Sequence, residues 1–184
     1  MKNCWLLLLS IFLLSACGTH PKQEKSITPF TFTNQHGQPF GTDHLTETVW
    51  IVDFIFTNCK TVCPPMTVEM AKLQEQFKEE GIDAEFVSFT VDPTIDSPNV
   101  LKEYLTQFTD DDSNWHMLTG YSQDEIETFA REQFQTIVQK PSSSNQVIHG
   151  TYFYLIDKNG ILVNEYSYIN TSYSKELIKD IKKR

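Results

Sequence analysis

The sequence predicts an α/β fold in which helices cover both faces of a mixed β-sheet. Two observations carry this prediction. Between residues 49 and 134, apolar strand-like runs alternate with segments whose apolar residues recur at helical spacing. From residue 151 onward, an apolar hairpin is followed by a final helical segment. Strands alternating with helices form parallel pairs, whereas a hairpin adds antiparallel strands, so the combined sheet is mixed.

The N-terminal part of the domain is predicted to be a β-hairpin followed by a buried strand. Residues 30–40 contain two short strand-like runs around a turn at Asn34-Gln-His-Gly37. Residues 49–56 are apolar apart from Asp53. A continuous apolar run of this length is typical of a strand that is covered on both faces.

A helix and a second buried strand are predicted next. The helix covers residues 64–80 and ends at Gly81. Residues 85–91 form the strand, which stops at Asp92 because Pro93 favours an extended conformation there. The core-facing residues of the helix recur at helical spacing, and they are Met66, Met70, Leu73 and Phe77.

The remaining elements follow from caps and turns. Ser97 and Pro98 suit the cap and first position of a helix, and Ser122 with Glu125 forms a capping box. Asn159-Gly160 is a hairpin turn. The expected elements are a helix over 97–108, a short strand over 115–118, a helix over 122–134, a hairpin of strands 151–156 and 161–166, and a helix over 172–183.

The first residues predict export and a lipid anchor. Residues 1–16 read as a lipoprotein signal peptide, because a short charged start precedes a leucine-rich run shorter than the roughly 20 apolar residues of a membrane span. Small residues before Cys17 resemble a lipobox, in which this cysteine receives lipid. The alternatives are an ordinary signal peptide with an incidental cysteine and a short membrane anchor. Residues 17–28 are a polar tether, and residues 29–184 are the folded domain. The expected location is the bacterial cell membrane, with the domain on its extracytoplasmic face.

The net charge and the positions of the cysteines narrow the range of functions that the chain could have. The chain has 24 acidic and 15 basic residues, a net charge of −9, which argues against nucleic acid as a partner. A domain of this length buries enough core to fold without a disulfide framework. With Cys4 in the signal peptide and Cys17 lipidated, Cys59 and Cys63 form an isolated pair, which suggests redox or soft-metal chemistry.

The prolines after the second cysteine set the expected local geometry. Pro64 disfavours helical backbone at Cys63, so we expect the helix to begin at about Pro65 and both cysteines to lie in the preceding loop. A helix N-terminus stabilises negative charge, so at least one of the thiols is expected to have a lowered pKa. The thiolate is both a nucleophile and a metal ligand, so this feature fits a redox pair and a metal site alike.

His149 is the candidate third ligand. It precedes the apolar run 151–156 and is expected at the start of a central strand, facing the loop after strand 49–56. Two thiolates are too few for structural zinc, which usually takes four ligands, whereas two thiolates and an imidazole suit copper. The alternative is a hydrogen-bonded structural histidine. The remaining histidines, His20, His36, His44 and His116, carry no comparable signal.

Three motifs together resemble the Sco (SenC/PrrC) family, and the resemblance covers about residues 28–183. They are Phe56-Thr-Asn-Cys59-Lys-Thr-Val-Cys63-Pro64, Ser88-Phe-Thr-Val-Asp92-Pro93 and Ile148-His149-Gly150-Thr-Tyr-Phe-Tyr-Leu-Ile-Asp157. Their order and spacing match the family. This chain departs from many relatives by its lipid anchor in place of a transmembrane helix, and by Lys-Thr-Val between the cysteines.

The resemblance implies a thioredoxin-like fold with an N-terminal hairpin. It implies a membrane-tethered metallochaperone that assists assembly of the binuclear copper centre, CuA, in subunit II of cytochrome c oxidase. The copper ligands of the family match Cys59, Cys63 and His149, and Asp92 matches a position near the site where a carboxylate orients or tunes the ligands. For Asp92 the alternative is a turn residue before proline.

Two alternative functions use the same thiols. In the first, the chain is a thiol-disulfide oxidoreductase that reduces the cysteines of the CuA site, with Cys59 and Cys63 as the redox-active pair. Such a protein needs a thiol reductant as a partner, whereas a metallochaperone needs a copper donor. The second is a thiol peroxidase, which leaves His149 unexplained.

Overall fold

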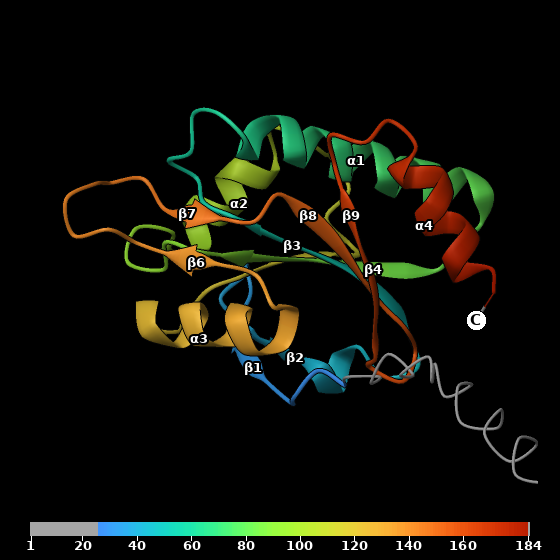
Figure 1. The fold of residues 1–184 in the computed structure, drawn as a ribbon, viewed down its shortest axis with the longest axis horizontal. Coiled ribbons are helices and arrows are strands. Elements are labelled where there is room, and N and C mark those ends of the chain that lie inside the picture. The colour runs from blue at the N-terminus through green and yellow to red at the C-terminus, as the bar shows by residue number, and fades with distance from the viewer. Residues whose placement is uncertain (1–25, 184) are drawn as a thin grey trace, which may run out of the picture.

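The structure is a computed structural model that describes residues 26–183, and its elements alternate as the sequence predicts (Figure 1). The strands are Thr31–Thr33 (β1), Pro39–Gly41 (β2), Val49–Ile55 (β3), Ala84–Thr90 (β4), Trp115–Leu118 (β5), Val138–Gln139 (β6), Ile148–His149 (β7), Tyr152–Ile156 (β8) and Leu162–Ser167 (β9). The α-helices are Cys63–Glu80 (α1), Pro98–Leu105 (α2), Gln123–Phe134 (α3) and Tyr173–Ile181 (α4), and Thr42–His44 (η1) is a 3₁₀ turn.

The central sheet has the strand order β5-β4-β3-β8-β9. β3 pairs with β4 and β4 with β5 in parallel, whereas β8 pairs antiparallel with both β3 and β9. The predicted mixed sheet is therefore confirmed. It is mixed because a strand–helix–strand unit supplies β3 and β4, while a hairpin supplies β8 and β9. The central strand β3 is buried along its whole length.

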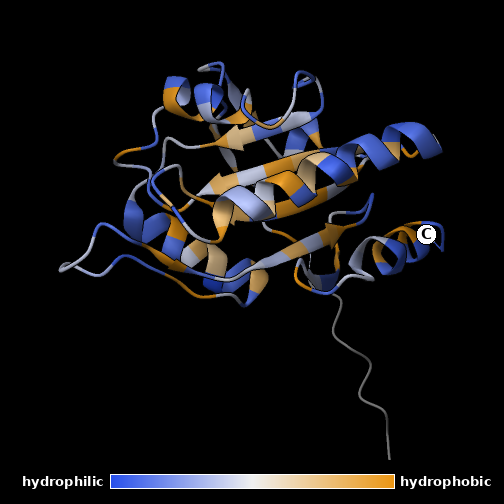
Figure 2. Cartoon of the chain, turned by 90° about the horizontal axis from the view of Figure 1, so that it is seen from above, coloured by the Kyte–Doolittle hydropathy of each residue, from blue (hydrophilic) through white to orange (hydrophobic). Residues whose placement is uncertain are grey.

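Helices lie on both faces of this sheet. In Figure 1, α1 and α4 lie above the strands, and α3 lies below them beside the β1–β2 hairpin. α4 is joined to α1 by a bond from the Tyr173 hydroxyl to the Glu69 carbonyl (3.1 Å). α3 contacts the hairpin through the ring of Phe129, which lies 5.4 Å from that of Phe30. The helices carry both apolar and polar residues, as expected of helices that cover an apolar sheet (Figure 2).

The N-terminal hairpin has the predicted turn. The Asn34 side-chain oxygen accepts hydrogen bonds from the backbone N–H groups of His36 and Gln38, both at 3.0 Å. Gly37 adopts a φ of 74°, which favours glycine. The buried side chain of Gln35 joins the hairpin to β5, since it donates to the carbonyl of Trp115 and accepts from the N–H of Met117.

Two sequence-based predictions about the site elements were wrong. α1 begins at Cys63, not at about Pro65, so only Cys59 lies in the preceding loop. Pro64 and Pro65 lie in the first helical turn, where their missing N–H groups need no partner. His149 lies in β7, a two-residue strand paired with β6, and not at the start of the central strand β8.

The predicted signal peptide, residues 1–16, and the lipidation site Cys17 lie outside the described residues. The end of the predicted tether, residues 17–28, is described: Ser26 pairs with Ile161, and Ile27 is buried. Within residues 26–183, no helix has the length and apolar character required to cross a membrane.

Candidate metal centre

Cys59, Cys63 and His149 come together in the structure. Their donor atoms all lie within 4.8 Å of one another, and both cysteines are free thiols. Within the described part of the chain, this is the group of three or more His, Cys, Asp or Glu residues that could hold a metal ion. The sequence placed His149 opposite the loop after β3, and this spatial prediction is confirmed.

The two thiols are positioned by the connection between β3 and α1. The N–H of Cys59 donates to the carbonyl of Phe56 (3.2 Å), closing a turn directly after the strand. Cys63 is the first residue of α1, and its N–H donates to the sulfur of Cys59 (3.3 Å). A free N–H at a helix N-terminus therefore points at one of the two sulfurs, as expected for an anion site.

The environments of the two thiols drive their pKa values apart. Burial raises the pKa of Cys59, but hydrogen bonds from Cys63 and from the backbone of residues 61–63 outweigh burial and hold it below its ordinary value. Burial raises the pKa of Cys63 strongly, and its hydrogen bond to Cys59 and the charges of Cys59 and Asp53 raise it further. The predicted lowered pKa thus belongs to Cys59, which is the better nucleophile of the pair.

His149 presents one ring nitrogen to the thiols. Its Nδ1 lies 2.8 Å from the carbonyl of Gly150, which can only accept, so Nδ1 carries the proton. Nε2 therefore has a free lone pair, and it lies 3.3 Å from the Cys63 sulfur. Burial lowers the pKa of His149 against the raising effect of the Gly150 bond, so the imidazole is neutral at pH 7. Neutral imidazole held through its other nitrogen is the form that binds metals.

The donor set fits copper. Two sulfurs and one imidazole nitrogen are soft and borderline ligands, the combination that copper prefers. Cys59 and Cys63 are only 5% and 0% exposed, so bound metal would be shielded from water on the thiol side. The ring of Phe56 meets His149 edge-on, with centroids 5.7 Å apart, and restricts the imidazole.

Asp92, predicted to orient or tune the ligands, is buried, and the hydrogen bonds of its carboxylate are to residues other than the three candidate ligands. Its carboxylate accepts from Lys140 Nζ (2.6 Å) and from the hydroxyl of Thr94 (2.9 Å). Its role in tuning the ligands stays a prediction. The sequence did not single out Lys140, which carries no local signal.

Two other buried acids were not predicted as functional. Neither carboxylate oxygen of Asp53 has a hydrogen-bond partner within the described residues, and the side chain is fully buried. Asp96 accepts from both the N–H and the hydroxyl of Thr57. The sequence feature that could have identified Asp53 is its position as the one charged residue in the apolar run 49–56.

The remaining described histidines lie apart from the thiols. His36 pairs with Asp112 at 3.1 Å, and His116 pairs with Glu85 at 2.8 Å. His44 and His116 both stack on Phe40. Their contacts are those of structural residues.

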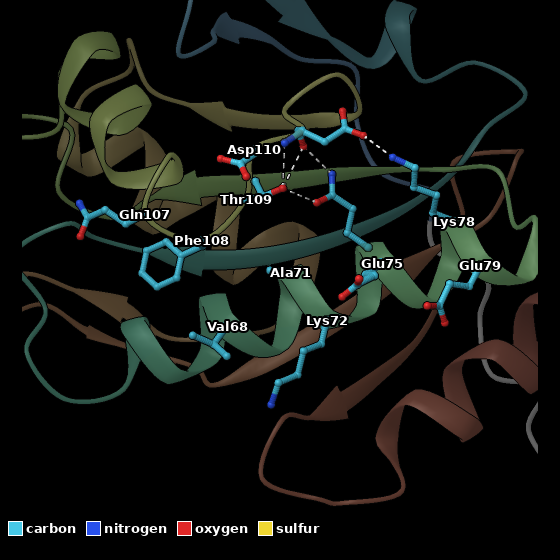
Figure 3. A pocket seen from close by; sticks show the side chains of 12 residues that line it. Val68, Ala71, Lys72, Glu75, Lys78, Glu79, Gln107, Phe108, Thr109 and Asp110 are labelled. Carbon is cyan, nitrogen blue, oxygen red and sulfur yellow. Dashed lines mark hydrogen bonds and ion pairs between the residues drawn. The ribbon is translucent and has the colours of Figure 1, made fainter.

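A groove of about 680 Å³ between α1 and residues 107–111 is also separate from the centre, since none of the three candidate ligands lines it (Figure 3). Some of its polar side chains bond to one another. Lys78 pairs with Asp111 (3.0 Å), and Gln74 accepts from Thr109 (3.0 Å).

Comparison with known proteins identifies the family. The SCO1/SenC family model matches residues 18–184. The crystal structure of a SCO1/SenC family lipoprotein from Bacillus anthracis str. Ames is 51% identical, with a TM-score of 0.84, covering 88% of this chain and 97% of that chain. The structure of BsSco, described as a member of the Sco family of cytochrome c oxidase assembly proteins with a disulfide switch, is 43% identical, with a TM-score of 0.79, covering 87% and 93%.

A more distant relative has been solved with metal. Yeast Sco1 with copper bound is 27% identical, with a TM-score of 0.73, covering 87% of this chain and 90% of that chain. Each of these structural matches covers 87% or 88% of this chain. The thioredoxin-like α/β fold is thereby confirmed, and the chain belongs to the SCO1/SenC family.

Proposed function

We propose that this chain is a copper-binding assembly factor, a metallochaperone for the CuA centre of cytochrome c oxidase subunit II. It binds copper through Cys59, Cys63 and His149. The observation that carries the proposal is the convergence of two sulfurs and one imidazole nitrogen within 4.8 Å. An open set of three ligands suits a protein that must release its metal, because the receiving site can supply the next ligand.

The relatives support copper and this target. Yeast Sco1 has been solved with copper bound, and BsSco belongs to a family of cytochrome c oxidase assembly proteins. Copper binding must displace the thiol proton of Cys63, whose pKa is raised, so affinity should increase with pH.

A copper titration of the reduced protein tests the proposal. We expect one tight site with thiolate-to-copper charge transfer in the Cu(II) spectrum, and a loss of affinity of about 10-fold or more in His149→Ala, since a ligand is removed. His116→Ala is the matched control, because His116 is also partly buried and bonded but lies apart from the thiols. Binding that is indifferent to His149 would exclude the three-ligand site.

The unequal thiols favour a second candidate function, a thiol-disulfide oxidoreductase that reduces the CuA cysteines. Cys59 is then the attacking thiolate, and Cys63, whose pKa is raised, resolves the mixed disulfide. We expect iodoacetamide at pH 7.5 to label Cys59 several-fold faster than Cys63, as measured by peptide mass spectrometry. The oxidoreductase predicts that a His149→Ala strain still assembles CuA, whereas the metallochaperone predicts that it does not.

The proposed location is the outer face of a bacterial cell membrane, with lipid on Cys17 as anchor and a copper donor or thiol reductant as a further partner. A Bacillus anthracis relative of 51% identity is described as a lipoprotein. Fractionation of cells that express Cys17→Ala tests the anchor, since this variant should leave the membrane fraction.

A further inference from the structure

The loop between β4 and α2, residues 91–97, is bonded to segments that neighbour both halves of the candidate metal centre. Its two carboxyl-bearing residues are buried: Asp92 is 2% exposed and Asp96 is 0% exposed. Asp96 bonds to Thr57, in the segment that leads to Cys59, and Asp92 bonds to Lys140, which follows the strand paired with the one that carries His149.

Asp96 holds the cysteine side. Its carboxylate accepts from the backbone N–H of Thr57 (3.1 Å) and from the Thr57 hydroxyl (2.5 Å). The hydroxyl of Thr90 also donates to it. Because Thr57 lies two residues before Cys59, these bonds fix the start of the turn that carries the sulfur.

Asp92 holds the histidine side through Lys140. The ammonium group of Lys140 lies 2.6 Å from Asp92 Oδ1 and 3.0 Å from the Thr94 hydroxyl, and its side chain is only 24% exposed. The backbone N–H of Lys140 donates to the carboxylate of Glu127 on α3 (2.9 Å). Lys140 is thus bound to the loop by its side chain and to α3 by its backbone.

The strand that ends beside Lys140 is β6, and it pairs with β7, the strand that carries the imidazole. β6 pairs with β7 in the register Val138 to His149 and Gln139 to Ile148. Alternation along this ribbon places Val138, His149 and Lys140 on its inner face, while Ile148, on the outer face, is 55% exposed. Only two residues of each strand pair, so the ribbon needs contacts outside itself to keep its position.

We propose that Lys140 is a positioning residue of the metal centre: by its ion pair with Asp92 it holds the β6–β7 ribbon so that the His149 imidazole stays within reach of the Cys63 sulfur. Asp92 then acts on the imidazole through Lys140, without bonding to a ligand. This inference rests on the proposed copper site for its metal readout, but its structural content is independent of copper.

A double-mutant cycle tests the proposal. Copper affinity is measured by chelator competition on wild type, Lys140→Met, His149→Ala and the double variant. Lys140→Met should weaken binding about 10- to 100-fold, as is usual for partners behind a ligand, and should reduce the nitrogen hyperfine signal in the Cu(II) EPR spectrum. In the His149→Ala background the same substitution should change affinity less than about two-fold, because its effect passes through the imidazole.

Lys78→Met is the matched control, since it breaks the Lys78–Asp111 pair on the outer face of α1 and should leave affinity unchanged. Affinity in Lys140→Met equal to wild type, or the same loss with and without His149, would overturn the proposal. If wild type binds no copper, the proposed function is wrong. NMR of the metal-free protein then tests whether Lys140 positions the His149 ring. The His149 ring signals should then shift or broaden in Lys140→Met and not in Lys78→Met, and unchanged ring signals would again overturn it.

Discussion

Asp53 places a carboxyl group inside the apolar core, close enough to Cys63 for its charge to raise the pKa of that thiol. Burial raises the pKa of Asp53 to about 7, opposed by its register partner Ser88, whose interaction with the carboxyl falls short of a hydrogen bond. At pH values between 3.8, the ordinary pKa of the group, and about 7, the Asp53 carboxyl keeps its proton in the folded chain and has lost it in the unfolded chain. Stability must therefore fall as pH rises through this window.

We predict that Asp53→Asn removes this pH dependence. The penalty for the ionised carboxyl is on the order of 4 kcal/mol above pH 7, from a shift of roughly three pH units. The unfolding free energy of the variant relative to wild type should thus increase between pH 5 and pH 8, as measured by denaturant unfolding. Asp111→Asn serves as control, because hydrogen bonds from Ser113 and Lys78 lower the pKa of Asp111 to about 2. This carboxyl is therefore ionised in the folded and unfolded chains between pH 5 and pH 8, so the stability difference between Asp111→Asn and wild type should stay constant. Parallel curves for wild type and Asp53→Asn would refute the assignment.

Among the elements, the long apolar runs were predicted best. The strands expected at 49–56, 85–91 and 115–118 agree with β3, β4 and β5 to within one residue at each end. A strand that is buried on both faces requires a continuous apolar run, and such a run can be recognised directly in the sequence. The start of α1 was missed because the preference of a residue before proline is local, whereas the helix is anchored by packing of Met66, Met70, Leu73 and Phe77.

The β6–β7 ribbon could not be read from the sequence. A strand of two residues shows no alternation, and its pairing joins positions about ten residues apart across a polar loop. The partners of the site were hidden for the same reason: Lys140 and Asp92 are 48 positions apart, and Thr57 and Asp96 are 39 apart. The cysteines and His149, by contrast, were identifiable from residue type, spacing and family motifs.

Gly150 connects this ribbon to β8 where space is tight. A Cβ atom at this position would overlap the Thr136 hydroxyl. The carbonyl of Gly150 also accepts from the His149 ring, so any displacement moves the imidazole. We predict that Gly150→Ala costs about 1–3 kcal/mol of stability, the usual range for overpacking, and weakens copper binding. Adding Thr136→Ala should restore much of both, as measured by thermal unfolding and copper competition, and failure of this rescue would show that the steric explanation is wrong.

In the whole molecule, the candidate centre joins distant parts of the chain. Cys59 and Cys63 lie four residues apart, in the connection from β3 to α1 and at the start of α1. His149 lies in the β6–β7 ribbon, 86 residues after Cys63 in the sequence. The unfolded chain keeps the cysteine pair together and can still chelate copper through it. Folding alone brings the imidazole to the thiols, so the imidazole contributes most to any preference of copper for the folded state.

This difference predicts how copper stabilises the fold. A ligand present at 100 times its dissociation constant raises the unfolding free energy by about 2.7 kcal/mol if it binds only the folded chain, which for a domain of this size is roughly 5–10 °C in melting temperature. Binding to the unfolded cysteine pair reduces this shift in wild type. In His149→Ala, copper held by the thiols alone binds both states similarly, so the shift should nearly vanish even where the metal remains bound. Calorimetry of both proteins with and without Cu(I) under anaerobic conditions measures the two shifts, and Cys59→Ser/Cys63→Ser gives the zero point. Equal shifts in wild type and His149→Ala, both above the zero point, would mean that the folded chain holds copper in preference to the unfolded chain without the imidazole, and would overturn this prediction.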